Sequence, residues 1–259
     1  MLRFKGSILL KAFFLLIGLL IETTSWASDI HSPFHSKERL VFKVRWAFIH
    51  AGDVVLEILP TESIEGVQAY HFVMSARTTE FVDFFYQIRD RVDSYTDISM
   101  THSFLYMKEQ HGHLKNKIVV DMDCEKGWAR YSNFGKSEEP IPIQPGSFDP
   151  LSIFYAFRAH QLKENIVIQI PVTDGQRCLI SNAKVIKREP VQVPGGIFDT
   201  YLVEPEMGSI NGIFKKSENA KLLIWVTADA RQMPVKIKSG VKVGSFIAEL
   251  VSYEMGSHY

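Results

Sequence analysis

The chain has 259 residues, of which 46% are hydrophobic and 22% are charged, and its 29 basic residues equal its 29 acidic residues in number. A neutral chain without basic runs argues against nucleic acid as a partner and offers no polybasic patch to an anionic membrane. This length allows one large β domain or two small domains.

The first 27 residues are typical of an export signal. Three basic residues precede the unbroken apolar run Ala12–Ile21, and small residues at Ser25 and Ala27 suit a signal-peptidase site. A helical run of this length spans only about 15 Å, roughly half of the hydrocarbon core of a bilayer. We therefore predict a cleaved signal peptide over residues 1–27, a mature periplasmic chain that begins near Ser28, and no transmembrane segment in that mature chain.

Alternation of apolar and polar side chains predicts β-strands along most of the mature chain. The alternation is cleanest at residues 39–48, which is typical of a half-buried antiparallel strand. Residues 79–85 fit either one helical turn capped by Thr78 or Thr79, or a further strand. The expected strands in this part are Arg39–Phe48, Val54–Leu59, Val67–Ala76, Tyr86–Tyr95, Ser103–Glu109, Lys115–Asp121 and Trp128–Ser132.

A proline-rich segment at residues 137–149 interrupts this pattern, and its composition predicts an irregular loop. It is the candidate boundary between two halves, residues 28–136 and 150–259, of a single β-rich domain over residues 28–259. The strands expected beyond it are Ile166–Val172, Cys178–Lys187, Val191–Val203, Leu222–Thr227, Pro234–Lys238 and Ser245–Tyr253. About thirteen strands predict a mainly β protein, built as a curved antiparallel sheet, a half-barrel or a sandwich.

One α-helix is predicted over residues 150–162. Asp149 is a favourable N-cap, and Pro150 suits the first helical position, where its missing N–H costs nothing. Ile153 and Phe157 lie opposite the main apolar stripe. We expect the helix to cover the concave face of the sheet and to offer Ile153 and Phe157 to a second layer, a loop or a ligand. The main stripe contains Leu151, Phe154, Tyr155, Ala159 and Leu162.

Arg158 falls within the main apolar stripe, where a guanidinium is rarely buried without a partner. It can extend to water along its aliphatic stem, pair with an inward-facing acid such as Asp90, or meet an anionic ligand. Trp225 lies in an expected strand and can serve either the core or an apolar groove. The candidate ligand-binding residues are therefore Ile153, Phe157, Arg158 and Trp225.

Cys124 and Cys178 are the two cysteines of the chain. In an exported protein such a pair is commonly a disulfide, which would stabilise the fold by roughly 4 kcal/mol through loop closure. The alternative is two buried free thiols, and the spacing does not choose between them. With Asp149, Pro150 and Asp90, the two cysteines are expected to have structural roles.

Residues with chemical potential elsewhere form no recognised catalytic motif. His111 and His113 could chelate a metal with Glu109, but the flanking charges suggest an exposed polar edge. Asp121 and Asp123 could form a carboxylate pair for acid–base work, although a strand end explains them more simply. We expect a protein that is not an enzyme and has no metal and no cofactor.

Six segments, taken in order, resemble the DUF3108 family of exported bacterial proteins. The likeness covers nearly all of the mature chain and implies an exported, β-rich fold without assigned catalytic residues. The last hairpin also resembles the C-terminal half of lipoprotein carriers of the LolA and LolB type, which hold acyl chains in a half-barrel closed by helices. The six segments are Val41–Ile58, Ile88–Asp97, Phe148–Arg158, Val172–Gly175, Pro194–Pro205 and Leu222–Ile237.

These observations predict a non-enzymatic periplasmic protein that binds or carries an apolar, lipid-like envelope component, with the helix as a lid. A structural or protein-interaction module in envelope assembly, with the helix filling a closed core, is the alternative. An envelope hydrolase is a more remote one. A carrier needs a continuous apolar cavity, whereas an interaction module needs an exposed patch.

Overall fold

A computed structural model describes residues 34, 36–64, 66–206, 221–240 and 245–256. The chain divides into two units, residues 1–31 and 32–259, and every described residue belongs to the second. The predicted signal peptide lies outside the described residues. Within the described part, no helix has the length and apolar character needed to cross a membrane.

The described residues form one antiparallel sheet of 15 strands and two short helices, α2 (Glu80–Asp83) and α3 (Ser152–Arg158). In chain order the strands are β1 (Arg39–Trp46), β2 (Ile49–Ile64), β3 (Val67–Thr78), β4 (Arg89–Asp97), β5 (Ser103–His111), β6 (Lys115–Asp123), β7 (Trp128–Asn133), β8 (Lys136–Ser137), β9 (Ile141–Pro142), β10 (Val167–Thr173), β11 (Cys178–Val193), β12 (Gly196–Pro205), β13 (Leu222–Thr227), β14 (Pro234–Gly240) and β15 (Ser245–Glu254).

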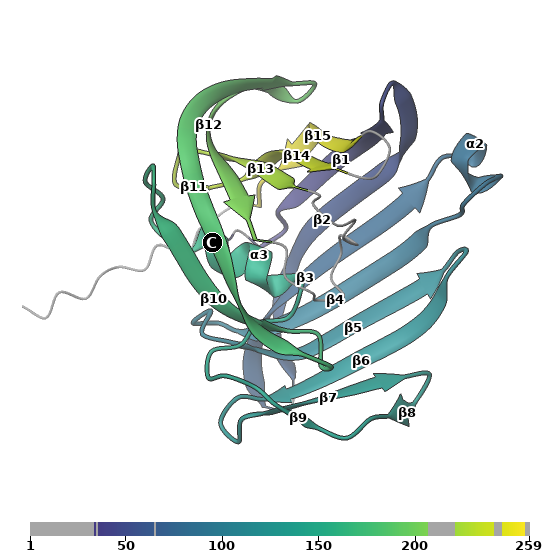
Figure 1. The fold of residues 1–259 in the computed structure, drawn as a ribbon, viewed down its shortest axis with the longest axis vertical. Coiled ribbons are helices and arrows are strands. Elements are labelled where there is room, and N and C mark those ends of the chain that lie inside the picture. Colours follow the sequence, from purple (N-terminus) through teal and green to yellow (C-terminus); the bar gives the residue numbers. More distant parts are fainter. Residues whose placement is uncertain (1–33, 35, 65, 207–220, 241–244, 257–259) are drawn as a thin grey trace, which may run out of the picture. The chain divides into compact units, whose positions relative to one another are not determined.

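The strand order runs from β10 through β15, continues with β1, and ends at β8, while β9 pairs with β7. The last strand therefore pairs with the first, and every other neighbour on this path is the next strand in sequence (Figure 1). The sheet is curved and antiparallel, which confirms the predicted fold class. It is one continuous sheet and not a sandwich of two.

The proline-rich segment is less irregular than expected, because the two-residue strands β8 and β9 both include part of it. Both pair with β7 at the edge of the sheet. Pro142 is tolerated there because an edge strand has a free side that needs no N–H donor. The strand bounds beside the β11–β12 turn also differ from the prediction, since β11 continues to Val193, Pro194 and Gly195 make a tight turn, and β12 begins at Gly196.

The core consists of two apolar clusters, and α3 contributes to both of them. Leu151 and Tyr155 belong to the first cluster, with residues of β1–β7, whereas Ala156 and Phe157 belong to the second, with residues of β10–β14. The helix contacts β4 and β10 (Figure 1). Each apolar side of α3 is therefore buried against strands of this chain.

Helix α3 is shorter than the predicted range of residues 150–162. The carboxylate of Asp149 accepts hydrogen bonds from the backbone N–H groups of Leu151 and Ser152 at 2.8 and 2.9 Å, so it still caps the segment. The helix ends at Arg158, because the N–H of Ala159 bonds to a carbonyl only three residues back. Such tightening is usual in a last turn.

Candidate functional site

The buried carboxylate of Asp149 lies at the centre of a polar cluster that joins α3 to the sheet. It accepts hydrogen bonds from the hydroxyls of Ser94 on β4 and Ser152 on α3 at 2.5 and 2.6 Å. Ser103 on β5 accepts the backbone N–H of Asp149 at 3.1 Å and contacts the Ser152 hydroxyl. All four residues are fully buried. The hydroxyls are thus committed to holding the helix, which agrees with a structural role for Asp149.

The buried guanidinium of Arg158 forms a two-pronged ion pair with Glu38, at N–O distances of 2.7 and 2.8 Å. It also donates to the carbonyl of Arg231 at 3.0 Å and lies 5.5 Å from the centre of the Phe34 ring. Burial lowers the pKa of Arg158, but the Glu38 carboxylate outweighs burial and raises it. Of the three alternatives for Arg158, the structure shows pairing.

The prediction that Asp90 is the partner of Arg158 was wrong. The Asp90 carboxylate accepts a hydrogen bond from Gln110 at 2.6 Å instead. Glu38 immediately precedes β1, and its side chain continues the two-residue period of Leu40 and Phe42 into the core. That continuation of the period was the signal that could have identified Glu38.

The other candidate ligand-binding residues do not meet at one site. Phe157 is buried in the second apolar cluster, and the half-buried Ile153 packs against the same cluster. Trp225 lies on β13, packs against the first cluster, and donates its indole N–H to Glu189 on β11 at 2.9 Å. The second contact expected for Ile153 and Phe157 is therefore made with apolar residues of strands β10–β14 of this protein.

The thiols of Cys124 and Cys178 are free and half-buried, so the structure shows the alternative without a disulfide. Both sulfurs contact Ser147, with Cys124 Sγ 3.9 Å from its carbonyl oxygen and Cys178 Sγ 3.6 Å from its hydroxyl. Burial raises the pKa of the Cys124 thiol. The two residues thus connect the end of β6 and the start of β11 to the segment before α3 through weak hydrogen bonds of their sulfur atoms.

The imidazole of His111 is exposed and lies 3.3 Å from a Glu109 oxygen, while the ring of His113 packs on Tyr86. Among the described residues, no group of three His, Cys, Asp or Glu side chains is arranged to hold a metal ion. Asp123 closes β6 and binds Lys126, which agrees with its interpretation as a strand end.

Exposed aromatic side chains gather at one end of the sheet, and we call this group the aromatic rim. The strand register places the β1–β2 turn, the β3–β4 connection, the β7–β8 turn and the start of β15 at this same end. Of nine exposed aromatic residues in the described part, eight lie here, and the ninth, Tyr253, lies at the far end of β15. The rim comprises Trp46, Phe48, Phe81, Phe84, Phe85, Tyr86, Phe134 and Phe246.

The aromatic side chains at the β3–β4 connection are held out by α2, which Figure 1 shows beside the ends of β3 and β4. Phe81, Phe84 and Phe85 are 64, 87 and 67% exposed. Their rings contact one another edge to face. Sequence reasoning missed the rim, although the aromatic run in residues 81–86 was a signal for it.

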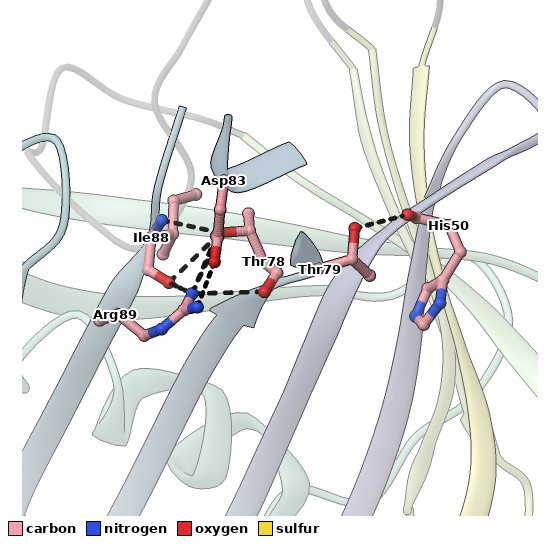
Figure 2. Close-up of polar contacts among 6 residues, drawn as sticks. All are labelled: His50, Thr78, Thr79, Asp83, Ile88 and Arg89. Carbon is pink, nitrogen blue, oxygen red and sulfur yellow. Dashed lines mark hydrogen bonds and ion pairs between the residues drawn. The ribbon is translucent and has the colours of Figure 1, made fainter. Parts of the chain in front are cut away.

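A network of polar contacts fixes α2 to the sheet (Figure 2). Arg89 on β4 forms a two-pronged ion pair with Asp83, the last residue of α2, and Asp83 also accepts a hydrogen bond from Thr78 on β3. Hydrogen bonds from Arg89 and Thr78 lower the pKa of Asp83. Thr79 holds the N-cap position, but its hydroxyl donates to the carbonyl of His50 at 3.2 Å and does not cap the helix. The predicted cap was therefore wrong, while the helical turn is present.

Comparison with solved structures shows similarity of fold at low sequence identity. A β-barrel-like protein of the DUF1849 family from Brucella abortus is 10% identical, with a TM-score of 0.56 over 86% of this chain and 99% of that chain. A provisionally assigned exported protein with a YmcC-like fold from Bacteroides fragilis is 7% identical, with a TM-score of 0.40 over 86% and 97%.

No curated protein matches the sequence. A family model, described as a protein of unknown function (DUF3108), matches residues 41–251. The match runs from within β1 to within β15 and includes both short helices and the whole aromatic rim, and it confirms the resemblance seen in the sequence. This chain belongs to the DUF3108 family.

Proposed function

We propose that the protein is an exported, non-enzymatic protein of the periplasm that binds an apolar, lipid-like envelope component at its aromatic rim. The sequence-based expectation placed such a component at α3, with the helix as a lid. Because Phe157 and Arg158 are engaged within the core, the contact is better assigned to a surface that is exposed.

The segregation of exposed aromatic side chains is the observation that carries this proposal. Scattered single apolar residues on a surface need no explanation, whereas a contiguous group of them marks an interaction site. Phe48 and Phe84 are 90 and 87% exposed, although each could gain about 1.5–3 kcal/mol by full burial. Three separate connections and the start of β15 present such side chains at one end of the sheet, which favours a shared binding role.

The protein-interaction module is the second candidate function. It is favoured by α3, whose two apolar sides fill the core as that alternative requires. Aromatic residues are also enriched at protein interfaces. The two candidates therefore share the rim and differ in whether it contacts lipid or protein.

Native mass spectrometry of protein purified from its own envelope tests the choice. Wild type should retain a lipid-like adduct and should also bind the monomeric apolar probe 1-N-phenylnaphthylamine. The double change Phe84→Ser with Phe85→Ser should lose both, since these two exposed rings contact each other and Phe81 of the rim. The double change Val67→Ser with Ile98→Ser removes exposed apolar residues at the opposite end and should retain both.

Absence of lipid and probe binding in wild type would contradict the proposal. Crosslinking of a protein partner to rim positions in the same preparation would then favour the interaction module. Export is tested separately by N-terminal sequencing of periplasmic protein, which should begin near Ser28. An intact Met1 in the membrane pellet would contradict the cleaved signal peptide.

A further inference from the structure

We propose that the aromatic rim docks on the surface of a lipid bilayer and inserts its side chains at the membrane–water interface. This inference rests on the proposed function, because it names the physical form of the apolar component at the same rim. In this arrangement the strands β1–β7 and β15 lead away from the membrane and their opposite ends face water.

The lateral extent of the rim favours a surface over a single small ligand. Its residues lie at the ends of β15, β1–β4 and β7, within a run of eight neighbouring strands from β15 to β7. At about 4.8 Å per strand, the rim extends roughly 34 Å along the sheet edge. One acyl chain cannot contact tips spread so widely, whereas a bilayer surface can contact all of them at once.

The chemical character of the rim matches the interfacial zone of a bilayer. Aromatic side chains suit that zone because a large apolar ring can insert beside the headgroups, and Trp and Tyr concentrate there. Trp46, Tyr86 and six phenylalanines form the rim. At the opposite end the exposed apolar residues in the β2–β3 and β4–β5 turns are the aliphatic Val67 and Ile98. Exposed aromatic residues are thus concentrated at the rim end, where Leu114 is an exposed aliphatic residue, whereas Tyr253 is the exposed aromatic residue at the opposite end among the described residues.

Charges of both signs lie beside the rim, and several of them are paired within the protein. Asp83 is paired with Arg89, and Arg45 is paired with Glu249. Another carboxylate in this region, that of Asp53, lies 3.0 Å from the imidazole of His50. Docking should therefore depend on ring insertion, should proceed on zwitterionic membranes, and should respond little to salt.

The rim is also organised before it binds. The Asp83–Arg89 ion pair and the hydrogen bond from Thr79 to His50 hold α2 against three strands (Figure 2). A rigid group of aromatic side chains loses less conformational freedom on docking than a flexible loop would. The network thus supports insertion of Phe81, Phe84 and Phe85 without contacting the membrane itself.

Flotation with phosphatidylcholine vesicles on a density gradient tests this proposal, at low and at high salt. Wild type should float in both conditions. Phe84→Ser with Phe85→Ser should lower the vesicle partition coefficient at least about tenfold. The control pair Val67→Ser with Ile98→Ser should change it less than about twofold, with circular dichroism showing that both variants are folded.

Wild type that does not float, yet binds 1-N-phenylnaphthylamine through the rim, would overturn bilayer docking and leave the proposed function standing. Wild type that neither floats nor binds the probe would overturn both bilayer docking and the proposed function. Equal losses in the rim and control variants would overturn the assignment to the rim, as would flotation that disappears at high salt. Capture of a soluble protein at rim positions without flotation would also overturn bilayer docking.

Discussion

Replacing Arg158 with leucine should strand the carboxylate of Glu38 in the core. The two side chains are 0 and 1% exposed, and Arg158 donates both prongs of the pair and a third bond to the Arg231 carbonyl. Removing one partner of a buried ion pair typically costs about 3–5 kcal/mol, because the remaining charge is uncompensated. That is a large share of the roughly 5–15 kcal/mol by which a folded domain is stable.

Denaturant melts of single and double variants measure this cost. Arg158→Leu should lower the free energy of unfolding by about 3–5 kcal/mol, and the combination with Glu38→Leu should recover much of the loss. The combination with Asp90→Leu is the matched control and should recover nothing, because Asp90 is bonded to Gln110. If Arg158→Leu fails to fold, the two double variants provide the same comparison. Folded protein should then be recovered by adding Glu38→Leu and not by adding Asp90→Leu. A single variant as stable as wild type, or recovery through Asp90, would refute the reasoning.

Three further predictions concern the carboxylates and thiols. Burial opposes ionisation of Asp93, but hydrogen bonds from a histidine and an arginine outweigh it and lower its pKa to about 2, from 3.8. Ionised Asp93 contributes about 1 kcal/mol to the free energy of unfolding after screening by solvent. This contribution is fully present above the pKa that Asp93 has in the unfolded state and is lost as pH falls toward 2. Asp93→Asn should therefore reduce the loss of stability at acid pH, as measured by melts at a series of pH values. Asp149→Ala should cost about 3 kcal/mol in denaturant melts, since it removes the acceptor of two backbone N–H groups and two hydroxyls; a loss below about 1 kcal/mol would contradict its structural role. Denatured, unreduced protein should show two reactive thiols, and native Cys124 should react slowly because burial raises its pKa; absence of thiols would show a disulfide with Cys178.

Local patterns in the sequence were sufficient for the class of fold. A two-residue period reflects the alternation of side chains across a strand, so it identified most strands, including β1 and β15, without knowledge of their neighbours. Asp149 likewise marked the start of the helical segment through interactions within a few residues. The short strands β8 and β9 were missed because pairing with β7 sustains them, not their own propensity.

Contacts between distant residues depended on the tertiary structure. The sequence by itself determined that Arg158 needs a partner if buried, because an isolated charge in a core is too costly. Only the folded chain selected Glu38, which lies 120 positions away in sequence and comes within reach through the packing of α3 against the sheet. The aromatic rim has the same origin: the sequence shows aromatic residues in separate turns, and the antiparallel register alone brings those turns to one end of the sheet.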